Sequence, residues 1–196
     1  MRRVALTGGI ATGKSHVLAR IDAHGVPTID ADRLARQAIA PGTDGERRVI
    51  QRFGDTIVAR DGTIDRGALG RIVFADPQAR QDLEGIVHPF VYEAIERWFA
   101  GLPTGTAAAV ADIPLLFETG READFDLVIV TACSPDEQIR RLVARDGLAK
   151  ADALARIATQ RSIAEKVARA DVVIDTNGSI EDTNRQVDAL IAEWSV

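Results

Sequence analysis

The sequence predicts an α/β fold in which helices cover both faces of a doubly wound parallel sheet. First, short segments that are apolar throughout alternate with segments whose apolar residues recur at helical spacing. Second, strands that are apolar throughout are typical of a parallel sheet that is buried on both faces. Third, the chain has 196 residues, 46% of them hydrophobic, which suffices for one compact domain with a small inserted subdomain.

The first half of the chain begins with strands and helices in alternation and continues as a helical region. The expected elements are a strand at 4–6, a helix at 14–24, a strand at 26–29, and helices at 31–39 and 45–53. Gly62 marks a turn. From Asp65 to Leu102 the pattern is helical, with breaks expected at Asp76-Pro77 and His88-Pro89, because proline disfavours a helix interior.

The second half returns to the alternation of strands and helices. The expected elements are strands at 107–111 and 126–132, a helix at 135–145, a single helix at 151–168, a strand at 172–174 and a helix at 180–193. The first of these strands is followed by Asp112, and Pro135 opens the helix that follows the second. We find no internal repeat and no low-complexity tract.

Composition limits the classes of function. Cys133 is the only cysteine, so we expect a reducing compartment and a buried, inert thiol. The net charge of −5 argues against a nucleic-acid partner. The first apolar segment is too short for a signal peptide, and no segment has the length of a membrane span. We therefore expect a cytoplasmic protein with no membrane partner, acting as a monomer.

Residues 140–169 are locally basic within this acidic chain. The segment contains eight Lys or Arg residues and three acidic residues, so its charge is +5 and that of the remainder is −10. This distribution is typical of a segment that binds a small anionic ligand. The alternative is a solvated helical face with no ligand.

Residues 8–15 match the phosphate-binding pattern G-x-x-x-x-G-K-[ST] without a mismatch, between an expected strand and an expected helix. Glycines allow several amides to point at phosphate oxygens, and the helix N-terminus adds partial positive charge. Lys14 is expected to reach the β- and γ-phosphates, and Ser15 to bind Mg²⁺. This pattern predicts a P-loop NTPase fold. The expected ATP-binding residues here are Gly8, Ala11, Thr12, Gly13, Lys14, Ser15 and His16.

A kinase must also orient the hydroxyl of a second substrate, and a carboxylate near the transferred phosphoryl group can do so. Asp30 and Asp32 follow the second strand, and ligands of doubly wound sheets lie beyond the carboxyl ends of strands. Both are candidates for this role. The alternative is that one of them only caps the helix over 31–39, and Asp30 is the nearer to that role.

Six segments form a selective pattern over nearly the whole chain: Leu6–Ile10, Ile29–Arg36, Leu83–Pro89, Asp112–Glu118, Arg145–Leu148 and Val173–Gly178. Their order and spacing resemble the dephospho-CoA kinase family. Many families share the phosphate loop, whereas the Asp-Ala-Asp, His-Pro and Pro-Leu-Leu-Phe-Glu segments together are far more selective. The chain departs from the family pattern at two places. Ala11-Thr12 stands where the family usually has Gly-Ser, and His16 stands where it usually has threonine.

The resemblance implies that the chain uses ATP and Mg²⁺ to phosphorylate the ribose 3′-hydroxyl of dephospho-coenzyme A, giving coenzyme A and ADP. It also implies a helical substrate-binding subdomain and a helical lid on the doubly wound core. The expected bounds are 1–58, 105–139 and 170–196 for the core, about 59–104 for the subdomain, and about 140–169 for the lid.

The resemblance also implies roles for single residues. Asp32 is implied to be the general base, and Arg141 a lid residue at the transferred phosphate that acts with Lys14 in catalysis. Arg145 lies four residues later on the same helix face and is implied to contact ATP. Thr7 and Arg161 are implied to contact the substrate.

Three further residues have two interpretations each. His88 is either a substrate contact or a turn or core residue. Leu115 lies in an apolar segment that forms either a wall beside the substrate or ordinary core. Asn177 either approaches the adenine of ATP or only forms an Asn-Gly turn.

Two other functions remain as alternatives. One is a different small-molecule P-loop kinase of the nucleoside or shikimate type, which the Asp-Ala-Asp and His-Pro segments disfavour. The other is a non-catalytic nucleotide-binding module. A guanine-reading Asn-Lys-x-Asp motif is absent, since Asn177 and Asn184 are followed by Gly and Arg.

Overall fold

The computed structural model describes residues 1–194 and divides the chain into two compact units. Unit 1 contains Met1–Ile29 and the chain from Leu102 onward, and unit 2 contains Asp30–Gly101. Among the described residues, no helix is long and apolar enough to cross a membrane. The helices of unit 1 are α1 (Lys14–Ala23), α6 (Pro135–Asp146), α7 (Lys150–Ile157), α8 (Ile163–Ala168) and α9 (Ile180–Ala192), with the short turn η2 (Glu122–Asp124).

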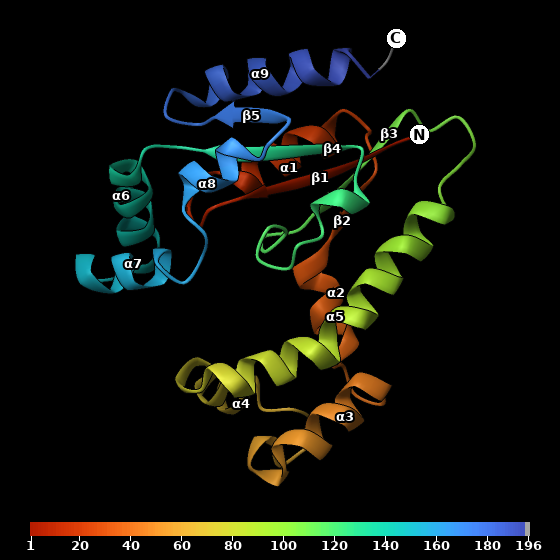
Figure 1. Cartoon of the computed structure of the whole chain (residues 1–196), viewed down its shortest axis with the longest axis vertical. Coiled ribbons are helices and arrows are strands. Elements are labelled where there is room, and N and C mark those ends of the chain that lie inside the picture. The colour runs from red at the N-terminus through yellow and green to blue at the C-terminus, as the bar shows by residue number, and fades with distance from the viewer. Residues whose placement is uncertain (195–196) are drawn as a thin grey trace. The chain divides into compact units, whose positions relative to one another are not determined.

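Unit 1 is built on a five-stranded parallel sheet with the strand order β2-β3-β1-β4-β5 (Figure 1). The strands are β1 (Arg2–Gly8), β2 (Thr28–Asp30), β3 (Ala108–Asp112), β4 (Leu127–Ala132) and β5 (Val172–Asp175). In the central strand, Val4 lies beside Val110 of β3 and Leu127 of β4. All the carboxyl ends therefore meet at one edge, and the predicted parallel α/β fold is confirmed.

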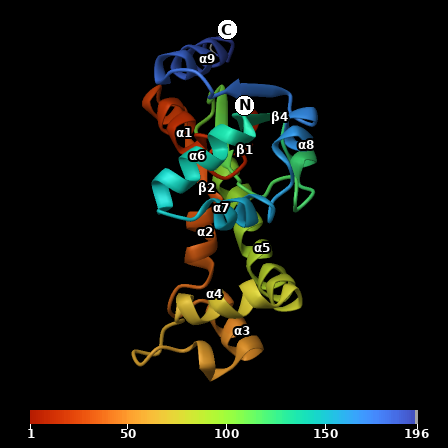
Figure 2. The ribbon, with the colours of Figure 1, turned by 90° about the vertical axis from the view of Figure 1, so that its left-hand side faces the viewer.

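Helices cover both faces of this sheet. Along β1, Val4 and Leu6 share one face with Ile129 of β4, and this face packs on Val17 of α1 and Val187 of α9. On the opposite face, α8 packs against β4. Figure 2 shows α1 and α9 on one side of the sheet and α8 on the other. The sheet is therefore doubly wound, and its interior contains aliphatic side chains from every layer.

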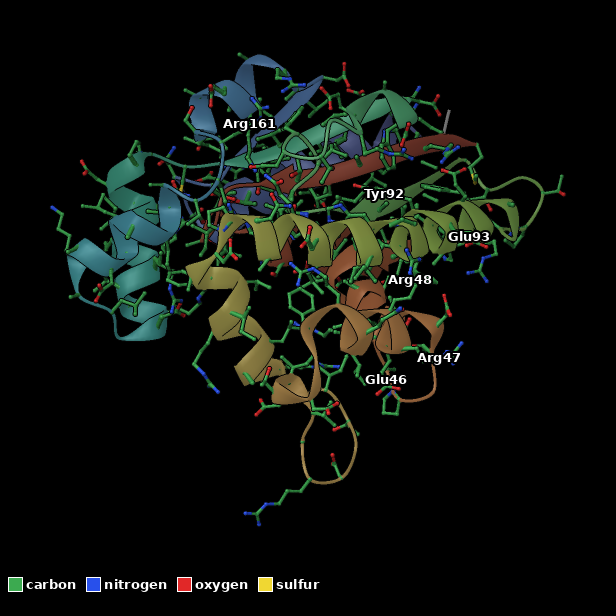
Figure 3. All side chains as sticks on the ribbon, turned by 60° about the horizontal axis from the view of Figure 1, so that its bottom comes forward. Glu46, Arg47, Arg48, Tyr92, Glu93 and Arg161 are labelled. Atoms are coloured by element: carbon green, nitrogen blue, oxygen red, sulfur yellow. The ribbon has the colours of Figure 1, made fainter. Side chains whose placement is uncertain are left out.

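Unit 2 consists of helices around a second core, in which Val49, Ile57 and Leu69 are buried. Figure 3 shows Arg48 on α3, and its guanidinium lies 5.8 Å from the centre of the Phe90 ring of α5. The elements of unit 2 are α2 (Ala31–Ala38), α3 (Asp44–Phe53), the short turn η1 (Asp55–Ile57), α4 (Arg66–Ala75) and α5 (Pro77–Ala100).

The boundary of unit 2 lies earlier in the chain than the sequence indicates. Unit 2 begins at Asp30, whereas the sequence predicts that residues 30–58 belong to the core and that the helical subdomain begins at about 59. The physical reason is that α2 and α3 both pack on α5. An amphipathic helix shows which of its faces is apolar, but not which distant element covers that face.

Helix α5 is continuous, so the expected break at His88-Pro89 is wrong. Pro89 lacks the amide that would bond to the carbonyl of Gly85, and Figure 1 shows a bend in the middle of α5. Buried Val87 and Val91 lie on either side of the proline. Their packing holds both halves in one helix, and the missing hydrogen bond bends it instead of ending it.

The single helix expected over 151–168 is also wrong, because the structure has two helices there. Helix α7 ends at Ile157 and α8 begins at Ile163. Ser162 accepts a hydrogen bond from the amide of Glu165 at 3.2 Å, and the Glu165 carboxylate accepts one from the amide of Ser162 at 3.1 Å. This reciprocal capping starts a new helix, and Ser-x-x-Glu was its signal in the sequence.

Candidate functional site

A glycine-rich loop connects β1 to α1 at the carboxyl edge of the sheet. Within it, φ is 60° at Ala11 and 85° at Gly13, so both residues are in the left-handed region. Ala11 is the only non-glycine residue with a positive φ among residues 1–194. Helix α1 starts at Lys14. The loop thus has the curled backbone and the helix N-terminus that a phosphate site requires.

Threonine hydroxyls form hydrogen bonds with the backbone of this loop. Thr12 donates from Oγ1 to the carbonyl of Gly9 at 2.7 Å, and the same oxygen lies 2.8 Å from Oγ1 of Thr131. Thr176 donates to the carbonyl of Thr12 at 2.9 Å. A β-carbon at Gly8 would lie 2.3 Å from Oγ1 of Thr131, so only glycine fits there. These bonds stabilise the curled backbone of the loop.

Lys14 is paired with Asp112, which ends β3. Its Nζ donates to both carboxylate oxygens and lies 2.7 Å from Oδ2. Asp112 is only 5% exposed, so little water screens this pair. Ser15 is the second residue of α1 and is exposed. A carboxylate and a hydroxyl are oxygen donors of the kind that Mg²⁺ binds, so Asp112 and Ser15 fit that cation chemically.

Arg141 of α6 is held on the loop that follows β5. It donates to the Thr176 carbonyl at 2.5 Å and to Oγ1 of Thr176 at 3.1 Å, and Nε donates to Glu137 at 2.6 Å. Hydrogen bonds from Arg140 and Arg141 lower the pKa of Glu137 to about 2. Because Thr176 also bonds to Thr12, the structure connects this arginine to the phosphate loop through one side chain.

A cavity of about 310 Å³ lies beside the loop and is lined by three of the predicted residues, Gly13, His16 and Arg141. Nε2 of His16 lies 2.8 Å from Oδ1 of Asn184. The cavity extends along the start of α9. Its lining residues are Gly13, His16, Arg141, Thr176, Gly178, Ser179, Ile180 and Thr183.

Asn177 does not line this cavity, and its side chain bonds to neighbouring residues of the turn. Its Oδ1 accepts from the amide of Ser134 at 2.7 Å, and its Nδ2 donates to Asp175 at 2.7 Å. Arg145 is also apart from the cavity, since its guanidinium donates to Asp146 and is half exposed. The geometry therefore favours the turn interpretation of Asn177.

The expected substrate residues of unit 1 differ in their surroundings. Thr7 is buried and donates to the carbonyl of Pro114 at 3.2 Å. Leu115, in the next turn, is 37% exposed, whereas Leu116 and Phe117 are core residues, so only part of this segment is a free apolar surface. Arg161 precedes α8 (Figure 3), and its guanidinium has no ion pair within the described chain.

The remaining expected residues belong to unit 2. Asp30 accepts a hydrogen bond from the amide of Arg33 at 3.0 Å, which confirms that it caps α2. The Asp32 side chain is exposed and makes no hydrogen bond or ion pair within residues 1–194. His88 is half buried, and burial lowers its pKa against the opposing charge of Glu84. Its ring meets that of Tyr92 edge-on at 5.9 Å.

Four residues that contact the loop or its lysine are not among those predicted from the sequence. Asp112 pairs with Lys14, and its signal was a carboxylate at the end of an apolar strand. Gln138 donates to the carbonyl of Ile10 at 2.7 Å, and Oε1 of Gln160 accepts from the amide of Ile10 at 2.9 Å. Lys166 donates to the carbonyl of Gly8. The last three contacts join distant segments and leave no local pattern.

Comparisons with known proteins agree with this geometry. A family model described as dephospho-CoA kinase matches residues 2–182. A protein of Cutibacterium acnes named dephospho-CoA kinase is 50% identical over 195 residues, which is 98% of this chain and 83% of that protein.

Two solved structures are similar to this chain over nearly its full length. A Thermus thermophilus protein has a TM-score of 0.84 at 35% identity, covering 98% of this chain and 97% of that one. The dephospho-CoA kinase from Campylobacter jejuni has a TM-score of 0.72 at 28% identity, covering 97% and 96%. Since the family model and these relatives span almost the whole sequence, the chain belongs to the dephospho-CoA kinase family.

Proposed function

We propose that this protein transfers the γ-phosphoryl group of ATP to the ribose 3′-hydroxyl of dephospho-coenzyme A, giving coenzyme A and ADP. The observation that carries the proposal is the preformed phosphate loop, whose Lys14 is held by the shielded carboxylate of Asp112. Family membership over residues 2–182 supports the choice of acceptor. A phosphate loop alone would support nucleotide binding without naming a reaction.

Electrostatic stabilisation is assigned to Lys14 and Arg141. On nucleotide binding, the Lys14 ammonium exchanges Asp112 for phosphate oxygens, where negative charge develops during transfer. Arg141 supplies a second cation from α6. Backbone amides of the loop, including those of Gly13 and Lys14, bind the remaining oxygens at the N-terminus of α1. The cavity lined by His16 and Arg141 is the proposed place for the nucleoside part of ATP.

Asp32 is the proposed general base. Its carboxylate accepts the proton of the ribose 3′-hydroxyl while that oxygen bonds to the γ-phosphorus and ADP departs. This assignment is supported by the absence of any structural bond from Asp32 within the described residues, whereas Asp30 is used as a cap. Mg²⁺, held by Ser15 and Asp112, would supply charge neutralisation at the phosphates.

Five residues are the proposed contacts of the acceptor. These are Thr7, Leu115 and Arg161 of unit 1 and Asp32 and His88 of unit 2, and the unpaired guanidinium of Arg161 suits an anionic group of the substrate. Unit 2 and residues 140–169 are the proposed substrate-binding subdomain and lid. Arg145 and Asn177 are proposed nucleotide contacts only after a rearrangement, since both are bonded to neighbours here.

We further propose that the protein acts as a monomer in the cytoplasm, with no membrane or nucleic-acid partner. The net charge of −5 supports the last of these points, because phosphate backbones attract basic surfaces. The single, buried Cys133 is consistent with a reducing compartment, and burial raises the pKa of its thiol.

The test is a coupled ADP-release assay with MgATP and four acceptors: dephospho-coenzyme A, adenosine, AMP and shikimate. Turnover is expected with dephospho-coenzyme A alone. Lys14→Ala is expected to abolish that turnover in a protein that still folds, because it removes a charge aimed at the transferred group. Preference for another acceptor would replace the proposed substrate, and near-normal turnover of Lys14→Ala would refute the assigned site.

A further inference from the structure

Lys166 of α8 is the only basic side chain among residues 1–194 that is buried, and its exposure is 0%. Its ammonium lies 3.2 Å from the carbonyl oxygen of Gly8, 3.3 Å from that of Pro114 and 2.9 Å from Oε1 of Glu118. The ammonium therefore makes its hydrogen bonds to the start of the phosphate loop and to the loop that follows β3.

Packing alone does not explain a lysine at this position. Removing an ammonium from water costs several kcal/mol even when it is paired, and an apolar side chain of similar volume commonly serves as well or better for stability. Lys166 faces two carbonyls and one carboxylate, and an apolar side chain would remove the one donor that all three share. The specific contribution of the lysine is thus the set of oxygen atoms that it holds together.

Two of these oxygens belong to backbone that borders the site. Gly8 ends β1 and opens the phosphate loop, so a donor on its carbonyl fixes the plane of the first peptide of that loop. The carbonyl of Pro114 also accepts from Thr7, and Leu115 follows it in the segment proposed to meet the substrate. One ammonium therefore sets the positions of two loops that approach the reacting groups.

The chain immediately before Lys166 is fastened to the same two loops. Gln160 accepts from the amide of Ile10 in the phosphate loop at 2.9 Å, and the amide of Arg161 donates to Glu118 at 2.9 Å. Residues 158–162 join α7 to α8, and Lys166 lies within α8. Residues 160–166 of the proposed lid therefore have three separate points of attachment beside the loop.

We propose that Lys166 is a positioning residue for phosphoryl transfer. Without touching either substrate, it holds the Gly8 peptide in the geometry that binds phosphate. It also links the position of residues 160–166 of the proposed lid to that of the phosphate loop. The inference rests on the phosphotransferase function proposed above, but binding of ADP tests it even if the acceptor has been misassigned.

The decisive variant is Lys166→Met combined with Glu118→Gln, which removes both charges and so avoids an isolated buried carboxylate. We measure the melting temperature, the Kd for MgADP by calorimetry, and kcat. The expected result is a folded protein whose Kd rises about tenfold, since one charge-assisted hydrogen bond on the loop is lost. A fall of about tenfold or more in kcat is expected as well, because small displacements of a reacting group are costly.

The matched control is Arg169→Gln with Glu122→Gln. This ion pair also joins the end of α8 to the segment after β3, but neither residue contacts the phosphate loop. Its Kd and kcat are expected to stay within about twofold of the parent, since a partly exposed ion pair contributes little. If both pairs change Kd and kcat equally, Lys166 is only structural. Unchanged values in the Lys166 pair also overturn the proposal.

If that double variant does not fold, Lys166→Gln is measured in its place, because it keeps a neutral donor. The same two constants are expected to worsen, by smaller factors. Parental Kd and kcat in a folded Lys166→Gln protein would show that a charged donor on Gly8 is not needed, and the proposal would be wrong.

Discussion

Ala11 has a φ of 60° in the phosphate loop, at the position where the dephospho-CoA kinase family usually has glycine. In the left-handed region a β-carbon crowds the following carbonyl oxygen, at a cost of about 1–2 kcal/mol. The loop adopts this conformation nonetheless, since hydrogen bonds from Thr12 and Thr176 to backbone carbonyls hold the residues on both sides of Ala11. We therefore expect alanine at this position to lower the stability of the protein.

Ala11→Gly is expected to raise the free energy of unfolding by about 0.5–1 kcal/mol, because relief of strain exceeds the added entropy of the unfolded chain. Chemical denaturation measures this change. The control is Ala155→Gly, an exposed position inside α7, where the same substitution should lower stability by about 1 kcal/mol. A loss of stability in Ala11→Gly would mean that the loop does not hold Ala11 in a strained conformation.

The two aspartates of the Asp-Ala-Asp motif have separate roles. Asp30 bonds to the amide of Arg33, whereas Asp32, two residues later, is exposed and has no partner within residues 1–194. Because the Asp32 carboxylate makes no structural hydrogen bond at the start of α2, it is available to bind a substrate.

Asp32→Asn is therefore expected to lower kcat by about 10²–10⁴-fold, with near-normal ATP binding and an unchanged melting temperature, because asparagine cannot accept the proton. Steady-state kinetics and calorimetry measure these quantities. Asp30→Asn is the control and should cost much less, since asparagine caps a helix as well as aspartate does. If the kcat of Asp32→Asn stays within a few-fold of that of the parent, Asp32 is not the general base.

At the scale of elements, most of the charge of residues 140–169 is neutralised by partners within the chain. Arg140 and Arg141 pair with Glu137, and Arg145 and Arg156 with Asp146. The segment is therefore not a uniform basic surface for an anion. It presents the unpaired guanidinium of Arg161 together with an Arg141 that α6 holds in place.

Glu137, one turn before Arg141 on α6, orients that arginine. Glu137→Gln is expected to lower kcat by about tenfold, because a misplaced charge stabilises the transition state poorly. The KM for ATP should change less. Arg140→Gln is the matched control, since it leaves the bond between Glu137 and Arg141 intact. Equal effects on kcat in the two variants would show that orientation of Arg141 by Glu137 is unimportant.

At the scale of the whole molecule, a charged cluster joins α1 to the last helix. Asp188 of α9 accepts from Nε and Nη2 of Arg20, both at 2.7 Å, and one of its oxygens lies 2.8 Å from Nε2 of His24. The hydrogen bond from Arg20, followed by that from His24, lowers the pKa of Asp188 to about 2. The cluster lies over the aliphatic core that these helices share.

This cluster predicts a pH dependence of stability. Because the folded pKa of Asp188 is depressed, its contribution is fully present above the unfolded value near 4 and is lost as the pH falls toward about 2. Denaturation of the parent and of Asp188→Asn from pH 7 to pH 2 should give a difference that is constant down to about pH 4 and then shrinks. A difference independent of pH would contradict the assigned pKa.

Several features of this protein follow from the sequence alone because they depend on neighbours along the chain. The strand, loop and helix around Gly13 and Lys14 are such features, as is the cap at Asp30. Proline shows the limit of this reasoning, since a local preference predicts a break at Pro89 where buried residues on both sides keep α5 continuous.

Only the tertiary structure decided which distant groups meet. The order β2-β3-β1-β4-β5 and the union of α2 and α3 with α5 depend on long-range packing that no local pattern encodes. In the sequence, Lys166 is one more basic residue of a charged segment, yet the fold buries it against Gly8 and Glu118. The physical reason is that burial and pairing are properties of surroundings, and residues up to 158 positions apart supply those of Lys166.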